Sequence, residues 1–147
     1  AHAIDACEAY YGNAAKEVCC IYATAPFVRG SDLCTGLNLL GEGAYSYVFP
    51  VASYPFPIQR ALRRGSSGVV EMFSPENFTK RSQDLEEAWH DAGQFYWSLA
   101  QNWRDGVTIF GFSAYGLPLP RHRVQDIDTP EDWTRAELLF RALQARK

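Results

Sequence analysis

The sequence predicts an α/β domain in which helices flank a mostly parallel sheet. Helical and strand patterns alternate along residues 1–51 in the order helix, strand, helix, strand, which is typical of such sheets. Residues 18–22 form an unbroken apolar run, VCCIY, as expected of a strand buried on both faces. With 147 residues, 47% of them hydrophobic and 21% charged, the chain fits one soluble globular domain.

The first part of the chain supplies two helices and two strands. The spacing of small and aromatic side chains predicts a helix within residues 1–16 that ends near Gly12. After the apolar strand, Ser31 caps a second helix whose leucines share one face. Residues 45–51 are rich in aromatic side chains and predict the second strand.

Residues 52–89 interrupt this alternation. Pro55 and Pro57 exclude a central strand, because proline cannot donate a hydrogen bond to a neighbouring strand. Two apolar runs, 58–63 and 69–73, flank a loop of glycine and serine and predict a hairpin. We therefore expect an antiparallel excursion from the main sheet, of the kind that serves as a lid or a dimerisation arm.

The rest of the chain returns to the main fold. Residues 90–97 predict a strand, and a short capped helix follows, ending near Gly106. The apolar run at 107–112 predicts a further strand. The last helix is expected over residues 130–146, with one apolar stripe and a basic end.

Composition and charge limit the possible partners. The formal net charge of −3 argues against nucleic acid as the main partner. No apolar run reaches the length of a membrane span, and no secretory signal is evident. The four cysteines lack metal-binding spacing and suggest reduced thiols. We therefore expect a cytoplasmic protein without a membrane partner.

The strongest local signal is a pair of acids just ahead of the last helix. Thr129 suits the N-cap, Pro130 the first helical position, and Asp132 completes an acidic capping box. Asp126 and Asp128 precede this cap on an extended segment, so their side chains point to the same side. Two such carboxylates suit Mg²⁺. Solvated loop acids or helix caps are the simpler interpretation of the pair.

Basic residues next to the pair favour the metal interpretation. Arg121, His122 and Arg123 immediately precede the acids. Cations beside an acidic pair suit a site where a metal meets a phosphate or a carboxylate.

Five further residues are candidates for substrate binding. Arg60 and Arg81 lie on the excursion and are either surface arginines or carboxylate ligands. Tyr22 and Thr24 follow the first strand, where packing and ligand roles are equally open. Gln94 lies in an apolar strand and needs hydrogen-bond partners, either backbone groups or a substrate. The nucleophile elbow, Walker loop, dinucleotide fingerprint and HExxH motifs do not occur.

Five blocks in unbroken order closely resemble the pseudaminic acid cytidylyltransferases, relatives of the CMP-sialic acid synthetases. The blocks are CIYATAPF at 20–27, FPIQRAL at 56–62, RSQDLEEA at 81–88, HDAGQFYW at 90–97 and RVQDIDTPEDW at 123–133. The resemblance implies a three-layer, Rossmann-like nucleotide-diphospho-sugar transferase fold. It also implies a reaction in which CTP and a nine-carbon 2-keto sugar acid give the CMP-sugar and pyrophosphate with Mg²⁺.

The resemblance assigns roles to the candidate residues. Asp126 and Asp128 would hold the metal, and Tyr22 and Thr24 would face the sugar. Contacts to the carboxylate and acylamino groups of the sugar would come from Arg60, Arg81 and Gln94. Residues 52–89 are similar to the family's dimerisation element, which implies a homodimer.

The chain departs from the family in one respect. Family members begin with a strand and a loop rich in Gly, Ser, Arg and Lys that cradles the CTP triphosphate, and these 147 residues contain no such loop. The resemblance thus implies that residues 1–147 are the C-terminal part of a single cytidylyltransferase domain, expected to be inactive alone. Another nonulosonic acid, such as sialic or legionaminic acid, stays open as the substrate. A non-catalytic sugar-acid-binding or assembly module is the alternative function.

Overall fold

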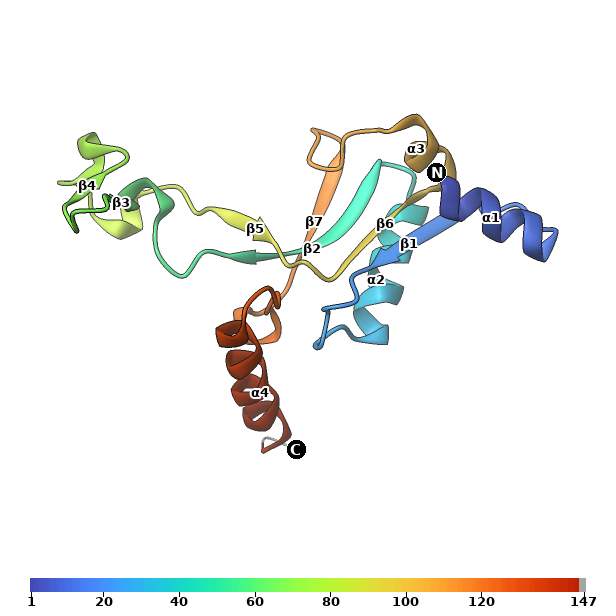
Figure 1. Cartoon of the computed structure of the whole chain (residues 1–147). Helices are drawn as coiled ribbons and strands as arrows, with labels where there is room; N and C mark the ends of the chain where they lie inside the picture. Colours follow the sequence, from blue (N-terminus) through green and yellow to red (C-terminus); the bar gives the residue numbers. More distant parts are fainter. Residues whose placement is uncertain (146–147) are drawn as a thin grey trace.

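A mixed five-stranded sheet forms the centre of the computed structural model, which describes residues 1–145 (Figure 1). Its strands are β1 (Glu17–Ile21), β2 (Tyr47–Ser53), β5 (Trp89–Asp91), β6 (Phe95–Leu99) and β7 (Ala114–Pro118). Strand β6 lies between β1 and β2 and pairs with the first residues of β2. Strand β5 pairs with the last residues of β2 along the same edge. Strand β7 pairs with the other edge of β2.

The prediction of a mostly parallel sheet is wrong. Strand β6 pairs antiparallel with both β1 and β2, β5 pairs antiparallel with β2, and β7 alone pairs parallel with β2. The cause is that the chain, on its return from the excursion, inserts β6 between the first two strands. Because β1 and β2 both oppose β6, they still run in the same direction as each other and as β7. The carboxyl ends of these three strands therefore meet at one edge of the sheet.

Helices pack on both faces of the sheet. Helix α2 (Gly30–Gly41) packs closely on one face, where a Cβ at Gly36 would lie 2.9 Å from the Trp97 ring. On the opposite face Tyr47, Phe49 and Tyr96 form a buried cluster. Helix α3 (Ala100–Asp105) covers this cluster with Trp103, whose ring centroid is 5.1 Å from that of Tyr47.

The first helix, α1 (His2–Tyr11), ends where the sequence predicts, with Gly12 as its C-cap, and is attached at the periphery. Arg104 of α3 holds it through ion pairs of 3.1 Å with Asp5 and 2.7 Å with Glu8. The last helix, α4 (Pro130–Gln144), confirms the predicted C-terminal helix within the described residues. Among those residues, none of the helices is long and apolar enough to cross a membrane.

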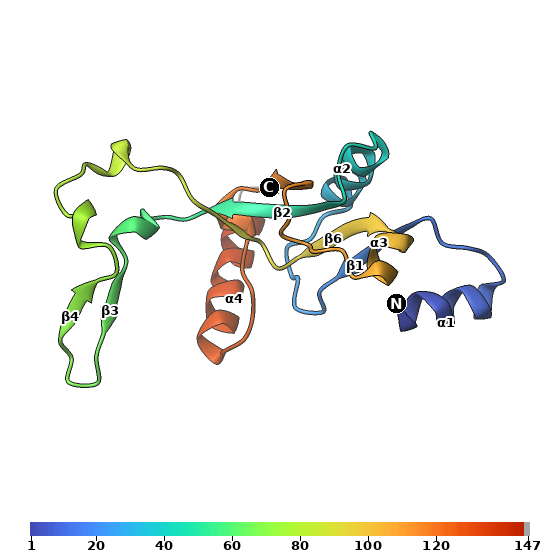
Figure 2. The same cartoon turned by 90° about the horizontal axis from the view of Figure 1, so that it is seen from above.

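The predicted hairpin is present in a long arm, residues 54–88, that connects β2 to β5. Strands β3 (Leu62–Arg64) and β4 (Val70–Met72) pair antiparallel near its tip. Both views show the arm extending away from the main sheet (Figures 1 and 2).

One predicted strand is wrong. Residues 107–112 form no strand, and the chain instead joins the sheet at β7, further along. From this loop Ile109 packs against the buried cluster and Phe110 lies edge-on to Phe49 at 5.3 Å, while Val107, Phe110 and Phe112 stay largely exposed. In β7, a Cβ at Gly116 would lie 2.9 Å from Val51 of the neighbouring strand. The close pairing of β2 with β7 therefore depends on a glycine at this position.

Candidate functional site

The acidic turn is held by the start of α4. The Oγ1 of Thr129 accepts a hydrogen bond from the Asp132 amide at 3.2 Å, and the Asp132 carboxylate accepts one from the Thr129 amide at 2.9 Å. The predicted capping box is therefore confirmed. The Asp132 carboxylate also accepts from the Asp128 amide at 3.3 Å. Hydrogen bonds to Asp132, led by that from the Thr129 hydroxyl, lower the pKa of its carboxyl.

Three separate segments meet at Asp126. Its Oδ1 accepts hydrogen bonds from the Ile127 amide at 3.0 Å and, at the long distance of 3.5 Å, from the Thr24 hydroxyl. A Cβ at Gly93 would lie only 3.3 Å from the Asp126 carboxylate. The structure thus places Thr24, from the loop after β1, beside the turn that precedes α4.

Gln94 connects the same segments through the backbone. Its side chain is buried, and Nε2 donates a 2.7 Å hydrogen bond to the Arg123 carbonyl. The backbone carbonyl of Gln94 accepts a hydrogen bond from the Tyr22 amide at 2.9 Å. The sequence left open whether a backbone group or a substrate would bond this buried amide, and for the nitrogen the partner is a backbone carbonyl. The Oε1 is buried without a partner among the described residues.

Tyr22 stands at the end of β1 beside a second tyrosine. The ring centroids of Tyr22 and Tyr96 are 5.3 Å apart, and Tyr22 is about half exposed. The Tyr96 hydroxyl donates a short 2.5 Å hydrogen bond to the Asp91 carboxylate. Burial, together with this carboxylate, raises the pKa of Tyr96, so the phenol stays protonated at neutral pH. Sequence reasoning missed Asp91, although an acid in an apolar strand is the same kind of signal that indicated Gln94.

The basic cluster ahead of the acidic turn divides between the interior and the surface. Arg123 points inward and forms an ion pair with Asp32 of α2, and both side chains are largely buried. Arg121 and His122 are exposed. Arg123 is therefore occupied in holding the turn on α2, and only its two neighbours face solvent.

The structure does not bring Arg60 and Arg81 to this site within one chain. Arg60 donates to the Ser82 hydroxyl at 3.5 Å, and Arg81 pairs with Asp84 at 2.8 Å. Both lie on the arm, which the two cartoons show pointing away from α4 and the acidic turn.

The donor set of the turn suits a hard cation. No group of three or more His, Cys, Asp or Glu side chains forms a metal cluster in the described part of the chain. The oxygen donors of the turn are the carboxylate of Asp126, with the Thr24 hydroxyl 3.5 Å away, and the exposed carboxylate of Asp128 two residues further along. Mg²⁺ commonly takes one or two carboxylates and completes its octahedron with water and substrate phosphates. The residues present therefore fit Mg²⁺ better than a metal that needs a closed protein cage.

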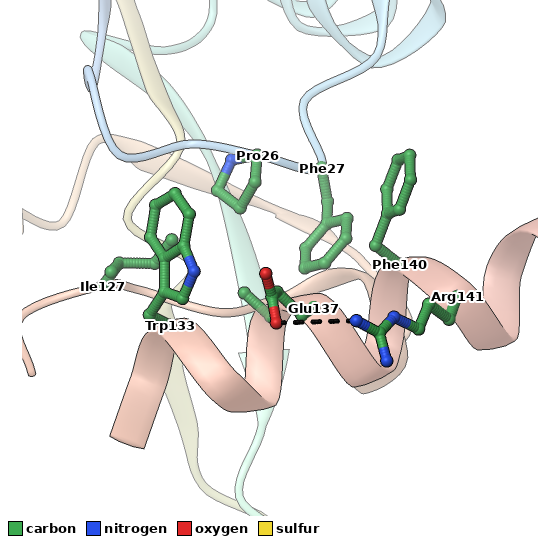
Figure 3. A pocket seen from close by; sticks show the side chains of 8 residues that line it. Pro26, Phe27, Ile127, Trp133, Glu137, Phe140 and Arg141 are labelled. Carbon is green, nitrogen blue, oxygen red and sulfur yellow. Dashed lines mark ion pairs between the residues drawn. The ribbon is translucent and has the colours of Figure 1, made fainter. Parts of the chain in front are cut away.

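Two hollows adjoin the acidic turn. An apolar groove of about 220 Å³ lies between α4 and the loop after β1, where Trp133 and Phe140 face Pro26 and Phe27 (Figure 3). The ion pair of Glu137 with Arg141, 3.8 Å long, is its polar feature. A larger polar cleft of about 640 Å³ adjoins Asp126.

The polar cleft opens at the edge where β2 and β7 end. It lies between the base of the arm, the turn after β5, the 3₁₀ helix Arg121–Arg123 and α4. Its ionisable lining residues are Tyr54, His90, Asp91, Arg121, His122, Asp126 and Arg135. The carboxyl ends of strands are where α/β sheets commonly bind ligands.

Comparison with known proteins confirms the resemblance stated from the sequence. The chain is 36% identical over 124 residues to the pseudaminic acid cytidylyltransferases of two Campylobacter jejuni subsp. jejuni strains, serotypes O:23/36 and O:2. These alignments cover 84% of this chain and 53% of each relative. N-acylneuraminate cytidylyltransferase B of Danio rerio is 29% identical in an alignment of 126 positions that covers 82% of this chain and 28% of that protein.

The relatives are thus nucleotidyltransferases by name. No family model matches the chain. The chain spans about half the length of the Campylobacter relatives it matches.

Proposed function

We propose that this chain supplies the sugar-acid and metal side of a cytidylyltransferase site. In the proposed reaction, CTP and a nine-carbon 2-keto sugar acid of the pseudaminic type give the CMP-sugar and pyrophosphate. The observation that carries the proposal is the meeting of Thr24, Gly93 and Asp126 at one edge of the sheet. The names of the relatives support the reaction class. In the same proposal, the mixed sheet belongs to a three-layer, Rossmann-like fold.

The proposed chemistry is an in-line displacement at phosphorus. The anomeric hydroxyl oxygen of the sugar acid forms a bond to the α-phosphorus of CTP, and the bond to the bridging oxygen of the leaving pyrophosphate breaks. The hydroxyl proton passes to solvent. A Mg²⁺ ion held by Asp126 and Asp128 would neutralise the charge that grows on the phosphates.

The residues of this chain orient and enclose the site. The Thr24 hydroxyl and the Ile127 amide fix Asp126, while Asp132 fixes the backbone of Asp128. Tyr22, which is about half exposed and packs against the buried Tyr96, offers an aromatic surface at the end of β1. Because Tyr96 keeps its proton and donates it in a hydrogen bond to Asp91, it holds that carboxylate in place and does not act as a base.

A homodimer is part of the proposal because the arm leaves Arg60 and Arg81 away from the Asp126 of their own chain. Large exposed apolar side chains gather on the arm, and such surfaces commonly mark protein interfaces. They include Phe56, Leu62, Val69, Phe73 and Phe78. Docked on a second copy, the arm would place both arginines near the partner's site.

The test is calorimetric titration of pseudaminic acid into the chain with Mg²⁺ present. We expect binding that disappears in Asp126→Asn and Asp128→Asn. Asp105→Asn is the matched control, because Asp105 is exposed on α3 and, among the described side chains, accepts a hydrogen bond from Gln101 alone, at 2.8 Å. Binding that is unchanged in both site variants would contradict the proposal.

Catalysis is tested separately by pyrophosphate release with CTP and the sugar acid. The 147 residues contain no Gly- and Lys-rich phosphate loop, so we expect no release by the chain alone. Release should appear when the part of the Campylobacter relative that lies outside the alignment is added in trans. Sugar-acid binding without release in that mixture would instead support the second candidate, a non-catalytic sugar-acid-binding module.

A further inference from the structure

We propose that the polar cleft beside Asp126 is an oxyanion subsite, in which Arg121 and Arg135 bind the carboxylate or phosphate of an acidic substrate. The inference rests on the proposed function, because it places this anion next to the proposed metal. The two arginines come from different elements, Arg121 from the 3₁₀ helix before the acidic turn and Arg135 from the second turn of α4.

The two guanidinium groups are available to a ligand. Among the described residues, no carboxylate lies within 4.0 Å of either Arg121 or Arg135. Their neighbour Arg123 differs, because Asp32 already pairs with it in the interior. The fork of a guanidinium matches a carboxylate or a phosphate with two parallel hydrogen bonds.

The acids of the cleft already accept hydrogen bonds from other groups. Asp91 accepts the short hydrogen bond from Tyr96, and Asp126 accepts from Ile127 and Thr24. Formally, two guanidinium charges and two carboxylate charges balance in the cleft. A divalent cation on Asp126 would leave two positive charges uncompensated. The cleft would then attract a dianion, or a carboxylate with a phosphate beside it.

The size and walls of the cleft fit a small polar molecule. A volume of about 640 Å³ lies within the roughly 300–1,000 Å³ range typical of ligand sites. Tyr54 and His90, whose ring centroids are 4.9 Å apart, form an aromatic wall, and Leu139 adds an apolar one. Such a mixture of cations and apolar surface suits an anionic group carried on a sugar or a nucleotide better than a bare inorganic ion.

The ligand chemistry has two sources, the carboxylate of the sugar acid and the phosphates of the nucleotide or pyrophosphate. Two titrations with Mg²⁺ present separate them, one with inorganic pyrophosphate and one with pseudaminic acid. We expect Arg121→Ala and Arg135→Ala each to lower the binding affinity for at least one of these two ligands by about 10-fold or more. Arg121→Lys should restore only part of the affinity, because lysine lacks the bidentate fork.

Arg141→Ala is the matched control, since Arg141 lies on the same helix but lines the apolar groove and pairs with Glu137. Thermal melting of each variant shows whether the fold is retained. Loss of pyrophosphate binding alone assigns the subsite to phosphate, and loss of sugar-acid binding alone assigns it to the carboxylate. Affinities equal to those of Arg141→Ala for both ligands would overturn the inference.

The outcome is separable from that of the proposed reaction. If the arginine variants lose anion binding but the completed enzyme releases no pyrophosphate, the subsite stands and the cytidylyl transfer fails. If pyrophosphate is released and neither arginine affects either ligand, the reaction stands and the subsite fails.

Discussion

The backbone of Gly93 lies directly against the carboxylate of Asp126. A Cβ at Gly93 would lie 3.3 Å from both Cγ and Oδ2 of Asp126, and Gly93 adopts a φ of +59°. The left-handed conformation therefore favours a glycine, and a Cβ there would require the Asp126 carboxylate to shift by a few tenths of an ångström. Since Gly93 immediately precedes the buried Gln94, this turn determines how closely β6 approaches the acidic turn.

We predict that Gly93→Ala lowers both stability and Mg²⁺ affinity. The left-handed backbone should cost about 1–2 kcal/mol, and the added methyl group should displace Asp126 and weaken Mg²⁺ binding by about 10-fold or more. Gly106→Ala is the matched control, because Gly106 has a φ of +65° but nothing within 4 Å of its Cβ position. Urea unfolding should show similar losses for the two variants, whereas Mg²⁺ calorimetry should show a loss for Gly93→Ala alone. Equal Mg²⁺ affinity in both would count against the role of Gly93.

The acidic turn could be predicted from the sequence because its signals are local. Thr129 and Asp132 define a helix start, and the spacing of Asp126 and Asp128 puts both acids ahead of it. The approach of Thr24 follows from strand direction, since β1 and β7 end at the same edge. Gly93 gave no comparable signal, because its contact depends on where β6 lies in the sheet.

Burial of the ion pair between Arg123 and Asp32 leads to a second prediction. Removing Asp32 would leave a buried guanidinium without its carboxylate, so Asp32→Ala should destabilise the fold by about 3–5 kcal/mol. Glu71→Ala breaks the exposed pair with Arg63 and should cost no more than about 1 kcal/mol. Denaturant unfolding of the two variants checks the difference. Similar losses would mean that the pair with Arg123 contributes no more than a surface contact.

The sequence did not predict which segments pair over long distances along the chain. An apolar run such as 18–22 fits a central strand whether its neighbours are parallel or antiparallel. The insertion of β6 beside it depends on the return of the chain from the arm, which no local pattern specifies. For the same reason, the pair of Arg123 with Asp32 joins residues 91 positions apart and could not be predicted. The run at 107–112 is a loop in which Ile109 packs against the core while Val107 and Phe112 are exposed, and periodicity does not separate such a run from a strand.

Cys19 should react far more slowly with alkylating reagents than its neighbour. Burial raises the pKa of the Cys19 thiol to about 11, so only about one molecule in a thousand carries the thiolate at pH 8. Cys20 is exposed on the same strand and is the internal control. Brief treatment with iodoacetamide, followed by mass spectrometry, should modify Cys20 well before Cys19. Equal rates at the two positions would show that β1 opens readily in solution.

Tyr96 should make the fold sensitive to alkaline pH. Its pKa is raised in the folded state by burial and by Asp91, so its contribution to stability is fully present below the unfolded tyrosine value near pH ~10. That contribution is lost as the pH rises further, because the unfolded chain then releases a proton that the folded chain retains. The unfolding free energy should therefore fall by up to about 1.4 kcal/mol per pH unit through this group.

Tyr96→Phe removes this pH-dependent contribution to stability and leaves the Asp91 carboxylate without its hydrogen-bond donor. We expect the variant to be less stable by about 1–3 kcal/mol at neutral pH but to have a shallower decline above pH ~10. Cys19 and Tyr47, whose pKa values burial also raises, keep contributing to the decline in both proteins. Urea unfolding at pH values from ~8 to ~11 measures both effects, with the exposed Tyr10→Phe as control for the substitution itself. A decline equally steep in Tyr96→Phe and in the unsubstituted chain would show that the phenol of Tyr96 reaches solvent.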